Sequence, residues 1–255
     1  MRRTGLIVAV AAIVAAAAHA QDYAREQRWA DEIVPAVVVG DPAWLTLANG
    51  RRFLSLLTTA PDAKTAIVLV HGIGVHPDHG VIGELRTKLA DAGYTTLSVQ
   101  MPVARGEGAT IDDYFPALFP EAGERIETAA RFLQQKGFQR IVLLSHSLGS
   151  FMSNVFLIDS AKRGGNRFIG WISMGRSGSF TEGTSATLRL PILDVLGERD
   201  LPAVRDAAAV RRLSLAGMPG SAQAVIAEAD HHYAGRESAL VSTIDAFVRR
   251  ISRGD

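Results

Sequence analysis

The sequence predicts an α/β protein with one mostly parallel, twisted sheet of eight strands and helices on both faces. Short β-branched runs alternate with stretches of helical periodicity from residue 66 to residue 251. Before them, two apolar runs flank Asn49-Gly50, a dipeptide that favours a tight hairpin turn. A hairpin followed by repeated strand–helix units indicates a sheet that is covered on both faces.

The expected elements follow from these patterns. Strands are predicted over Val37–Val39, Trp44–Leu47, Phe53–Leu57, Ala66–Val70, Thr95–Val99, Ile141–Leu144, Phe168–Ser173, Pro191–Leu196 and Ala222–Ala227. Helices are predicted over Tyr23–Ile33, Ile82–Ala92, Ile126–Leu133, Phe151–Ile158, Ala203–Leu213 and Glu237–Ile251. Gly93 and Gly137 each supply a helix stop.

Composition limits the classes of function. The 255 residues are 47% hydrophobic, which is ample for a two-layered core. The 27 Lys and Arg residues nearly balance the 26 Asp and Glu residues, so no net field attracts nucleic acid and no nucleic-acid partner is expected. The chain contains no cysteine, which excludes disulfides and thiol catalysis.

The N-terminus has the features of a secretory signal. Met1-Arg2-Arg3-Thr4 is a basic lead, Gly5–Ala18 is wholly apolar, and Ala18-His19-Ala20 fits the small-x-small cleavage rule. Fourteen apolar residues are too few to span a bilayer comfortably. We therefore expect cleavage after Ala20 and a periplasmic or secreted chain without an integral membrane anchor. The predicted organisation is a signal peptide at 1–20, a lead-in segment at 21–36 and a single domain at 37–255.

One strand-to-helix turn has the pattern of a nucleophile site. The apolar run Ile141–Leu144 stops at Ser145-His146-Ser147-Leu148-Gly149, and an apolar helix follows. Small residues lie two places either side of Ser147, as in the G-x-S-x-G elbow, where a tight turn strains the backbone at the serine. This pattern predicts Ser147 as a nucleophile. An ordinary turn that contains a serine is the alternative.

An acid and a base follow two later strands. Gly197-Glu198-Arg199-Asp200 follows one strand, and Asp230-His231-His232 follows the next. The carboxyl ends of parallel strands meet at one edge of a sheet. A serine hydroxyl needs an imidazole to take its proton, and the imidazole needs a carboxylate to hold its tautomer. We predict Asp200 and His231 for these roles.

Two alternatives to these residues stay open. His232 replaces His231 if the turn is shifted by one residue. Asp194, inside an apolar strand, could replace Asp200 as the acid, although a buried carboxylate there is more simply paired with an arginine.

The loop after the Ala66–Val70 strand can complete such a site. His71-Gly72-Ile73-Gly74 places the Ile73 amide in a glycine-flanked loop, and the Leu148 amide opens a helix. Fixed amides of this kind stabilise a tetrahedral oxyanion. His76, Asp78 and His79 form part of a metal-ligand pattern, but Gly74 stands where the preceding histidine is required, so no metal is expected. No cofactor is expected either.

Two segments bear on the pocket. Residues 101–120 carry Tyr114, Phe115 and Phe119, which either wall an apolar acyl pocket together with His71 or cap the core. Between Met174 and Pro191 the chain is too short for a large lid domain.

Taken together, these residues resemble the α/β-hydrolase superfamily over about Val37 to Ile251. In that family H-G-x supplies an oxyanion amide, here at Ile73, and the elbow carries the nucleophile, here Ser147. A G-x-x-D turn carries the acid, here Asp200, and a small-x-H turn carries the base, here His231. The elbow departs from the pattern at Ser145, where glycine is usual. The H-P-D at His76–Asp78, the L-D at Leu193–Asp194 and the D-H-H turn also resemble an exported bacterial group of unknown function.

The resemblance implies a serine hydrolase that cleaves an ester or related acyl bond of a small-molecule or acyl substrate through an acyl-enzyme. A carboxylesterase is favoured over a peptidase that uses the same residues. A non-catalytic, hydrolase-like binding protein of the cell envelope is the alternative from another class. The sequence does not specify the substrate or the oligomeric state.

Overall fold

A computed structural model describes residues 21–106 and 108–252. The predicted signal peptide therefore lies outside the described residues. The helices are α2 (Tyr23–Ile33), η1 (Val34–Ala36), α3 (Gly80–Asp91), α4 (Ile111–Tyr114), α5 (Phe119–Gln135), α6 (Leu148–Lys162), α7 (Thr184–Thr187), α8 (Pro202–Asp206), α9 (Ala208–Leu215) and α10 (Glu237–Ser252). The strands are β1 (Asp41–Thr46), β2 (Arg52–Thr58), β3 (Thr65–Val70), β4 (Thr95–Val99), β5 (Arg140–His146), β6 (Gly170–Met174), β7 (Ile192–Gly197) and β8 (Ala222–Ile226).

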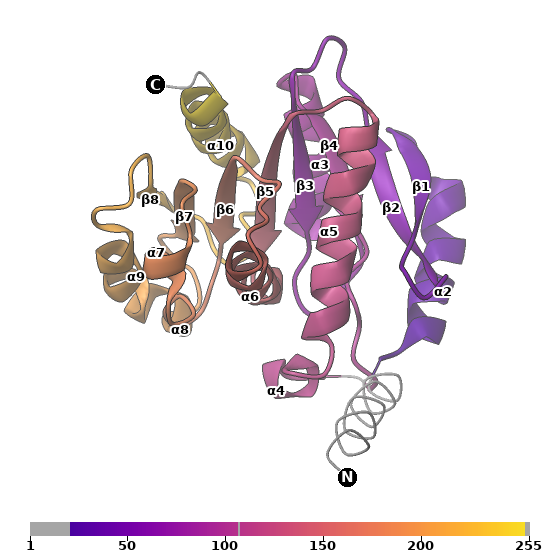
Figure 1. Ribbon diagram of the computed structural model, residues 1–255, viewed down its shortest axis with the longest axis horizontal. Helices are drawn as coiled ribbons and strands as arrows, with labels where there is room; N and C mark the ends of the chain where they lie inside the picture. The colour runs from indigo at the N-terminus through magenta and orange to yellow at the C-terminus, as the bar shows by residue number, and fades with distance from the viewer. Residues whose placement is uncertain (1–20, 107, 253–255) are drawn as a thin grey trace.

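The eight strands form one sheet in the order β1-β2-β4-β3-β5-β6-β7-β8. Strand β2 is antiparallel to both of its neighbours, and every pairing from β4 to β8 is parallel. The predicted fold class is confirmed. Because β3 to β8 run the same way, their carboxyl ends share one rim of the sheet (Figure 1).

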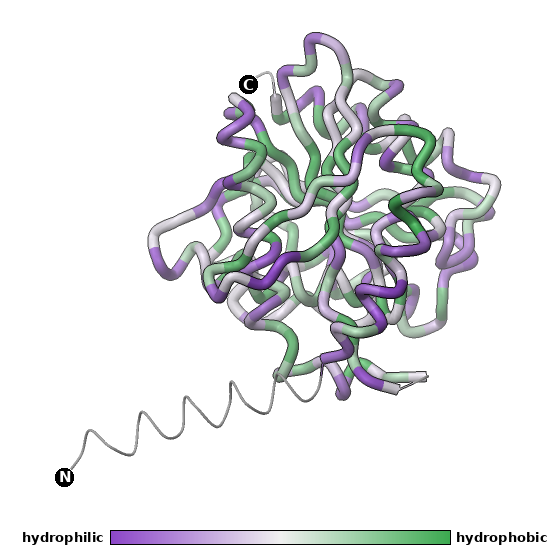
Figure 2. Tube along the Cα trace, turned by 90° about the vertical axis from the view of Figure 1, so that its right-hand side faces the viewer, coloured by the Kyte–Doolittle hydropathy of each residue, from purple (hydrophilic) through white to green (hydrophobic). Residues whose placement is uncertain are grey.

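Helices cover both faces of this sheet. Helices α5 and α6 pack on one face and α3 and α10 on the other; in Figure 1 α5 lies in front of the strands and α3 behind them. In β5 the side chains alternate between these two cores: Ile141 and Leu143 face α5 and α6, whereas Val142 and Leu144 face α3 and α10. Hydrophobic stretches gather in the interior of the molecule (Figure 2).

Two predicted elements are corrected by the structure. Val37–Val39 is not a strand: it follows the η1 turn around Pro35, and Val38 is 93% exposed. The first strand begins at Asp41 instead, where hydrogen bonds to β2 become available. The helix predicted over Ala203–Leu213 is divided at Ala207 into α8 and α9.

The connections around the rim are short. The segment between β6 and β7 contains only the four-residue helix α7, so no lid domain is inserted there. Across residues 21–106 and 108–252, no helix is both long and apolar enough to cross a membrane.

Candidate active site

Ser147 forms the turn between β5 and α6. The strand ends at His146 and the helix begins at Leu148, which leaves Ser147 with φ 53° and ψ −123°. Such a conformation is strained for a residue with a side chain. The Ser147 amide donates to the carbonyl of Met174 on β6 at 2.8 Å, which holds the turn in place.

The two small residues that flank Ser147, Gly149 and Ser145, are accommodated for different structural reasons. A Cβ on Gly149 would lie 2.5 Å from the His71 carbonyl oxygen, so only glycine lets α6 approach the loop after β3. Ser145, where glycine is usual, is fully buried, and its hydroxyl accepts a hydrogen bond from the Trp171 indole at 2.8 Å. The serine is tolerated because its polar atom has a partner.

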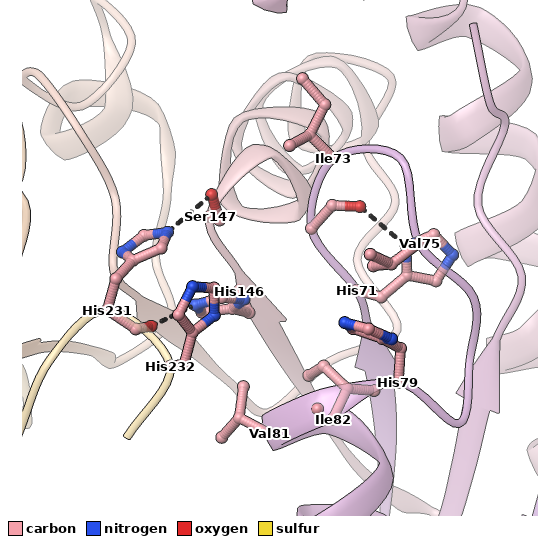
Figure 3. A pocket seen from close by; sticks show the side chains of 12 residues that line it. His71, Ile73, Val75, His79, Val81, Ile82, His146, Ser147, His231 and His232 are labelled. Atoms are coloured by element: carbon pink, nitrogen blue, oxygen red, sulfur yellow. Dashed lines mark hydrogen bonds between the residues drawn. The ribbon is translucent and has the colours of Figure 1, made fainter. Parts of the chain in front are cut away.

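The structure brings Ser147, His231 and Asp200 together at the rim. His231 Nε2 lies 3.1 Å from Ser147 Oγ (Figure 3). His231 Nδ1 lies 2.7 Å from Asp200 Oδ1. The His231 side chain is 12% exposed and the Asp200 side chain is fully buried. This is the order hydroxyl, imidazole, carboxylate that activates a serine.

Asp200 is fixed by backbone amides as well as by the imidazole. Its carboxylate accepts hydrogen bonds from the amides of Gly197 at 3.1 Å and Leu201 at 2.8 Å. Burial on its own raises the pKa of the Asp200 carboxyl, but the hydrogen bonds from His231 and Gly197 outweigh it and hold that pKa below its usual value. The ionised carboxylate therefore selects the His231 tautomer with hydrogen on Nδ1, leaving Nε2 free to accept the serine proton.

The two alternative residues lie elsewhere. His232 is exposed, and its ring centroid is 5.5 Å from that of His231, whereas the hydrogen bond with Ser147 comes from His231. Asp194 is buried in the interior of β7, where its carboxylate accepts from Arg211 Nε at 2.9 Å and from Gln223 at 2.8 Å.

The loop after β3 lies against the nucleophile. A Cβ on Gly72 would be 3.2 Å from Ser147 Cβ, so this loop closely approaches the serine. Within the described part of the chain, the amides of Ile73 and Leu148 donate to no protein acceptor. Two unused amides beside a serine are available to a developing oxyanion.

His71 holds the shape of this loop. Its Nδ1 lies 2.8 Å from the Gly72 carbonyl, which can only accept, so Nδ1 carries the hydrogen. Its Nε2 accepts from the Met101 amide at 2.9 Å. Burial lowers the pKa of His71 to about 3, so the imidazole stays neutral and both bonds persist at neutral pH.

A cavity of about 100 Å³ opens beside Ser147. It lies between the loop after β3, the start of α3 and the turn that carries His231 (Figure 3). Its walls combine aliphatic side chains with a serine hydroxyl and imidazoles, and contain no Asp, Glu, Lys or Arg. The lining residues are His71, Gly72, Ile73, Val75, His79, Gly80, Val81, Ile82, His146, Ser147, His231 and His232.

Of the predicted pocket residues, only His71 lines this cavity. Tyr114 and Phe119 are buried in the core shared with α5 and α6, which matches the core-capping alternative. Phe115 is 53% exposed. Tyr114 still contributes indirectly, because its hydroxyl accepts from the Gly74 amide at 3.1 Å in the loop after β3.

Sequence reasoning missed His146, which lines the cavity next to Ser147. The alternation along β5 gives the signal that could have found it: His146 shares the parity of Val142 and Leu144 and so faces α3 and α10. Its Nε2 lies 2.9 Å from the backbone carbonyl of His231.

This combination of sheet order and rim geometry matches known folds. The protein has the α/β-hydrolase fold. It is similar to Est1E from Butyrivibrio proteoclasticus (12% identity, TM-score 0.64), with 83% of this chain and 99% of that chain covered. It is also similar to an esterase from Pyrococcus furiosus (12%, TM-score 0.64, 82% and 91% covered). An α/β serine hydrolase without a lid from Xanthomonas campestris is similar too (14%, TM-score 0.60, 84% and 95% covered).

The sequence comparisons do not indicate an activity. Residues 5–115 match a family model described as "Protein of unknown function (DUF3530)". The matched part contains β1 to β4 and the loop after β3 but not Ser147. A search of curated proteins finds no match. The likeness to an exported bacterial group therefore stays a prediction.

Proposed function

We propose that this protein is a serine hydrolase that cleaves small, uncharged carboxylic esters through a covalent acyl-enzyme. The observation that carries the proposal is the pair of short contacts, 3.1 Å from Ser147 Oγ to His231 Nε2 and 2.7 Å from His231 Nδ1 to Asp200. If the His231–Asp200 pair served only stability, it would not need a hydroxyl group at His231 Nε2. A hydroxyl held in a strained turn at the mouth of a cavity is what nucleophilic catalysis requires.

The proposed reaction has two halves. Ser147 Oγ attacks the ester carbonyl carbon while His231 Nε2 takes its proton, and the amides of Ile73 and Leu148 bind the oxyanion. When the intermediate collapses, the C–O bond to the alcohol breaks and His231 returns the proton to the leaving oxygen. Water then attacks the acyl-enzyme with the same histidine as base. The bond between the acyl carbon and Ser147 Oγ then breaks, His231 returns the proton to Ser147 Oγ, and the acid product leaves.

The cavity supports the choice of substrate class. A volume of about 100 Å³ accommodates a group of a few carbon atoms, and the lining residues include no Asp, Glu, Lys or Arg to pair with a charged group. The esterases among the structural neighbours agree with this chemistry. An uncharged alcohol or acyl group is therefore proposed for this cavity.

Ser147→Ala tests the proposal, with p-nitrophenyl acetate as the ester. We expect kcat to fall at least about 10⁴-fold, because no other group can form the acyl-enzyme. Ser153→Ala is the matched control: it removes a buried α6 hydroxyl that has no partner among the described residues, and we expect kcat to be unchanged. Equal rates for Ser147→Ala and wild type would refute the function. A preference for peptide p-nitroanilides would assign it to the peptidase alternative.

We also propose that the protein is exported and cleaved after Ala20. Gln21, the first residue of the proposed mature chain, is buried, and its side chain donates to Glu26 and Glu121. The intact mass of protein from the periplasmic fraction tests this: a mature chain that begins at Gln21 is expected, and a retained Met1 would contradict it.

A further inference from the structure

His146 occupies a position that links the two halves of the proposed catalytic site. It is the last residue of β5, directly before Ser147, and only 7% of it is exposed. Side chains alternate along β5, so the His146 side chain lies on the opposite face of the sheet from that of Ser145. On that face it lies beside the turn after β8, which carries His231.

The contact between them is a single directed hydrogen bond. His146 Nε2 lies 2.9 Å from the His231 backbone carbonyl oxygen, and the two ring centroids are 4.8 Å apart (Figure 3). A carbonyl oxygen can only accept, so His146 Nε2 carries the hydrogen. This bond joins the residue next to the serine to the backbone of the histidine itself.

Several other hydrogen bonds hold the turn, and they tie it to the segment after β7: the Arg199 amide donates to the carbonyl of Ala229 at 2.8 Å, and the Glu228 amide donates to the Glu198 carboxylate at 2.7 Å. The turn contains two non-glycine residues with positive φ, Glu228 and Tyr233, so its backbone follows a constrained path. The Tyr233 hydroxyl anchors it to the carbonyl of Val195 on β7. That anchor fixes the turn to the strand that leads to the acid. The His146 bond fixes it to the strand that leads to the nucleophile.

The His146 ring is uncharged at neutral pH. Burial, followed by the neighbouring His231 imidazole, lowers the pKa of His146 to about 4. A neutral ring also avoids repulsion when His231 becomes an imidazolium during catalysis.

We propose that His146 is a positioning residue: its Nε2–H holds the His231 backbone and thereby sets the distance between the His231 imidazole and Ser147 Oγ. The proposal rests on the serine hydrolase function. Misplacing a reacting group by about 1 Å can reduce a rate about 10²-fold. His146 acts through His231 and does not contact the reacting atoms in this role.

Three substitutions separate the hydrogen bond from packing. Leucine in His146→Leu fills much of the volume but donates nothing. Glutamine in His146→Gln places an amide NH₂ as many bonds from Cβ as Nε2 is. Asparagine in His146→Asn has the same chemistry but is one carbon too short. For p-nitrophenyl acetate, we expect kcat to fall about 10²-fold in His146→Leu and His146→Asn with KM within about twofold, and His146→Gln to recover most of the rate.

Several outcomes would overturn the proposal. A wild-type kcat in His146→Leu would show that the bond is dispensable. Equal kcat values for His146→Gln and His146→Asn would show that the distance from the donor to the His231 carbonyl does not affect the rate. This pair of variants tests the proposal even if His146→Leu fails to fold. Failure of the function itself is distinguishable, because wild type would then hydrolyse no ester in a Ser147-dependent manner.

Discussion

Strand β7 and the turn after it hold two buried aspartates with different partners. Asp194 lies in the strand interior and is bound by Arg211, a permanent cation, and by Gln223. Asp200 lies six residues later, at the rim, and is bound by two backbone amides and by His231. The first carboxylate is surrounded by donors that never change charge. The second is bound to an imidazole whose other nitrogen reaches a hydroxyl.

The difference shows how position on a strand decides the use of a residue type. Within the sheet, both faces are packed, so a buried carboxylate without a fixed cationic partner would destabilise the fold. At the carboxyl end, the turn supplies amides that hold the charge while leaving one side open to a titratable group. The comparison predicts that Asp194 serves stability and that Asp200 serves catalysis.

The largest expected effect is on catalysis. Asp200→Asn should lower kcat about 10⁴-fold, because the amide favours the wrong His231 tautomer, as measured for the corresponding change in a serine protease. Steady-state hydrolysis of p-nitrophenyl acetate measures it. Retention of more than a tenth of the wild-type kcat would show that Asp200 is not the acid.

The opposite effect is expected in the strand interior. Asp194→Asn should lower the free energy of unfolding by about 3 kcal/mol, because it leaves the buried Arg211 guanidinium without a countercharge. Urea denaturation measures this loss, and kcat of the folded variant should stay within about threefold of wild type.

Glu84→Gln is the control for this measurement. It removes an exposed carboxylate that pairs with Lys88 on α3 and should change the free energy of unfolding by less than about 0.5 kcal/mol. An Asp194→Asn variant as stable as this control, or one as inactive as Asp200→Asn, would break the comparison.

An effect that is smaller for each histidine and pH unit concerns the neutral histidines of the rim. The folded-state pKa of His146 is about 4 and that of His71 about 3, both below the unfolded value of about 6.5. As the pH falls below 6.5, His71 and His146 become protonated in the unfolded chain but stay neutral in the folded protein. The free energy of unfolding should therefore fall by up to about 1.4 kcal/mol per pH unit for each histidine, down to its folded pKa.

Urea titrations between pH 6 and pH 4.5 measure this slope. His146→Gln should reduce it by the share of one histidine, whereas Glu84→Gln should leave it unchanged. An unaltered slope in His146→Gln would mean that His146 takes up protons equally in the folded and unfolded chain, which contradicts a lowered folded-state pKa.

Much of this architecture could be predicted from local pattern. Strand β4 and helix α2 have the predicted bounds because chain breaks mark them: Gly93 lies just before β4, and Pro35 follows α2. Ser147, Asp200 and His231 could be located because each follows a strand end. Val37–Val39 misled because β-branched composition alone does not supply a pairing partner. The pocket walls were not predictable, because only tertiary packing decides that Phe119 turns into the core while Val81 and Ile82 of α3 reach the cavity.

The most direct test of the central claim is reaction with a fluorophosphonate, followed by peptide mapping. In the proposed mechanism the His231–Asp200 pair activates the Ser147 hydroxyl, so we predict one adduct per chain, on the peptide that contains Ser147, and none in Ser147→Ala. An unmodified Ser147 in folded wild-type protein, or an equal adduct in Ser147→Ala, would contradict it.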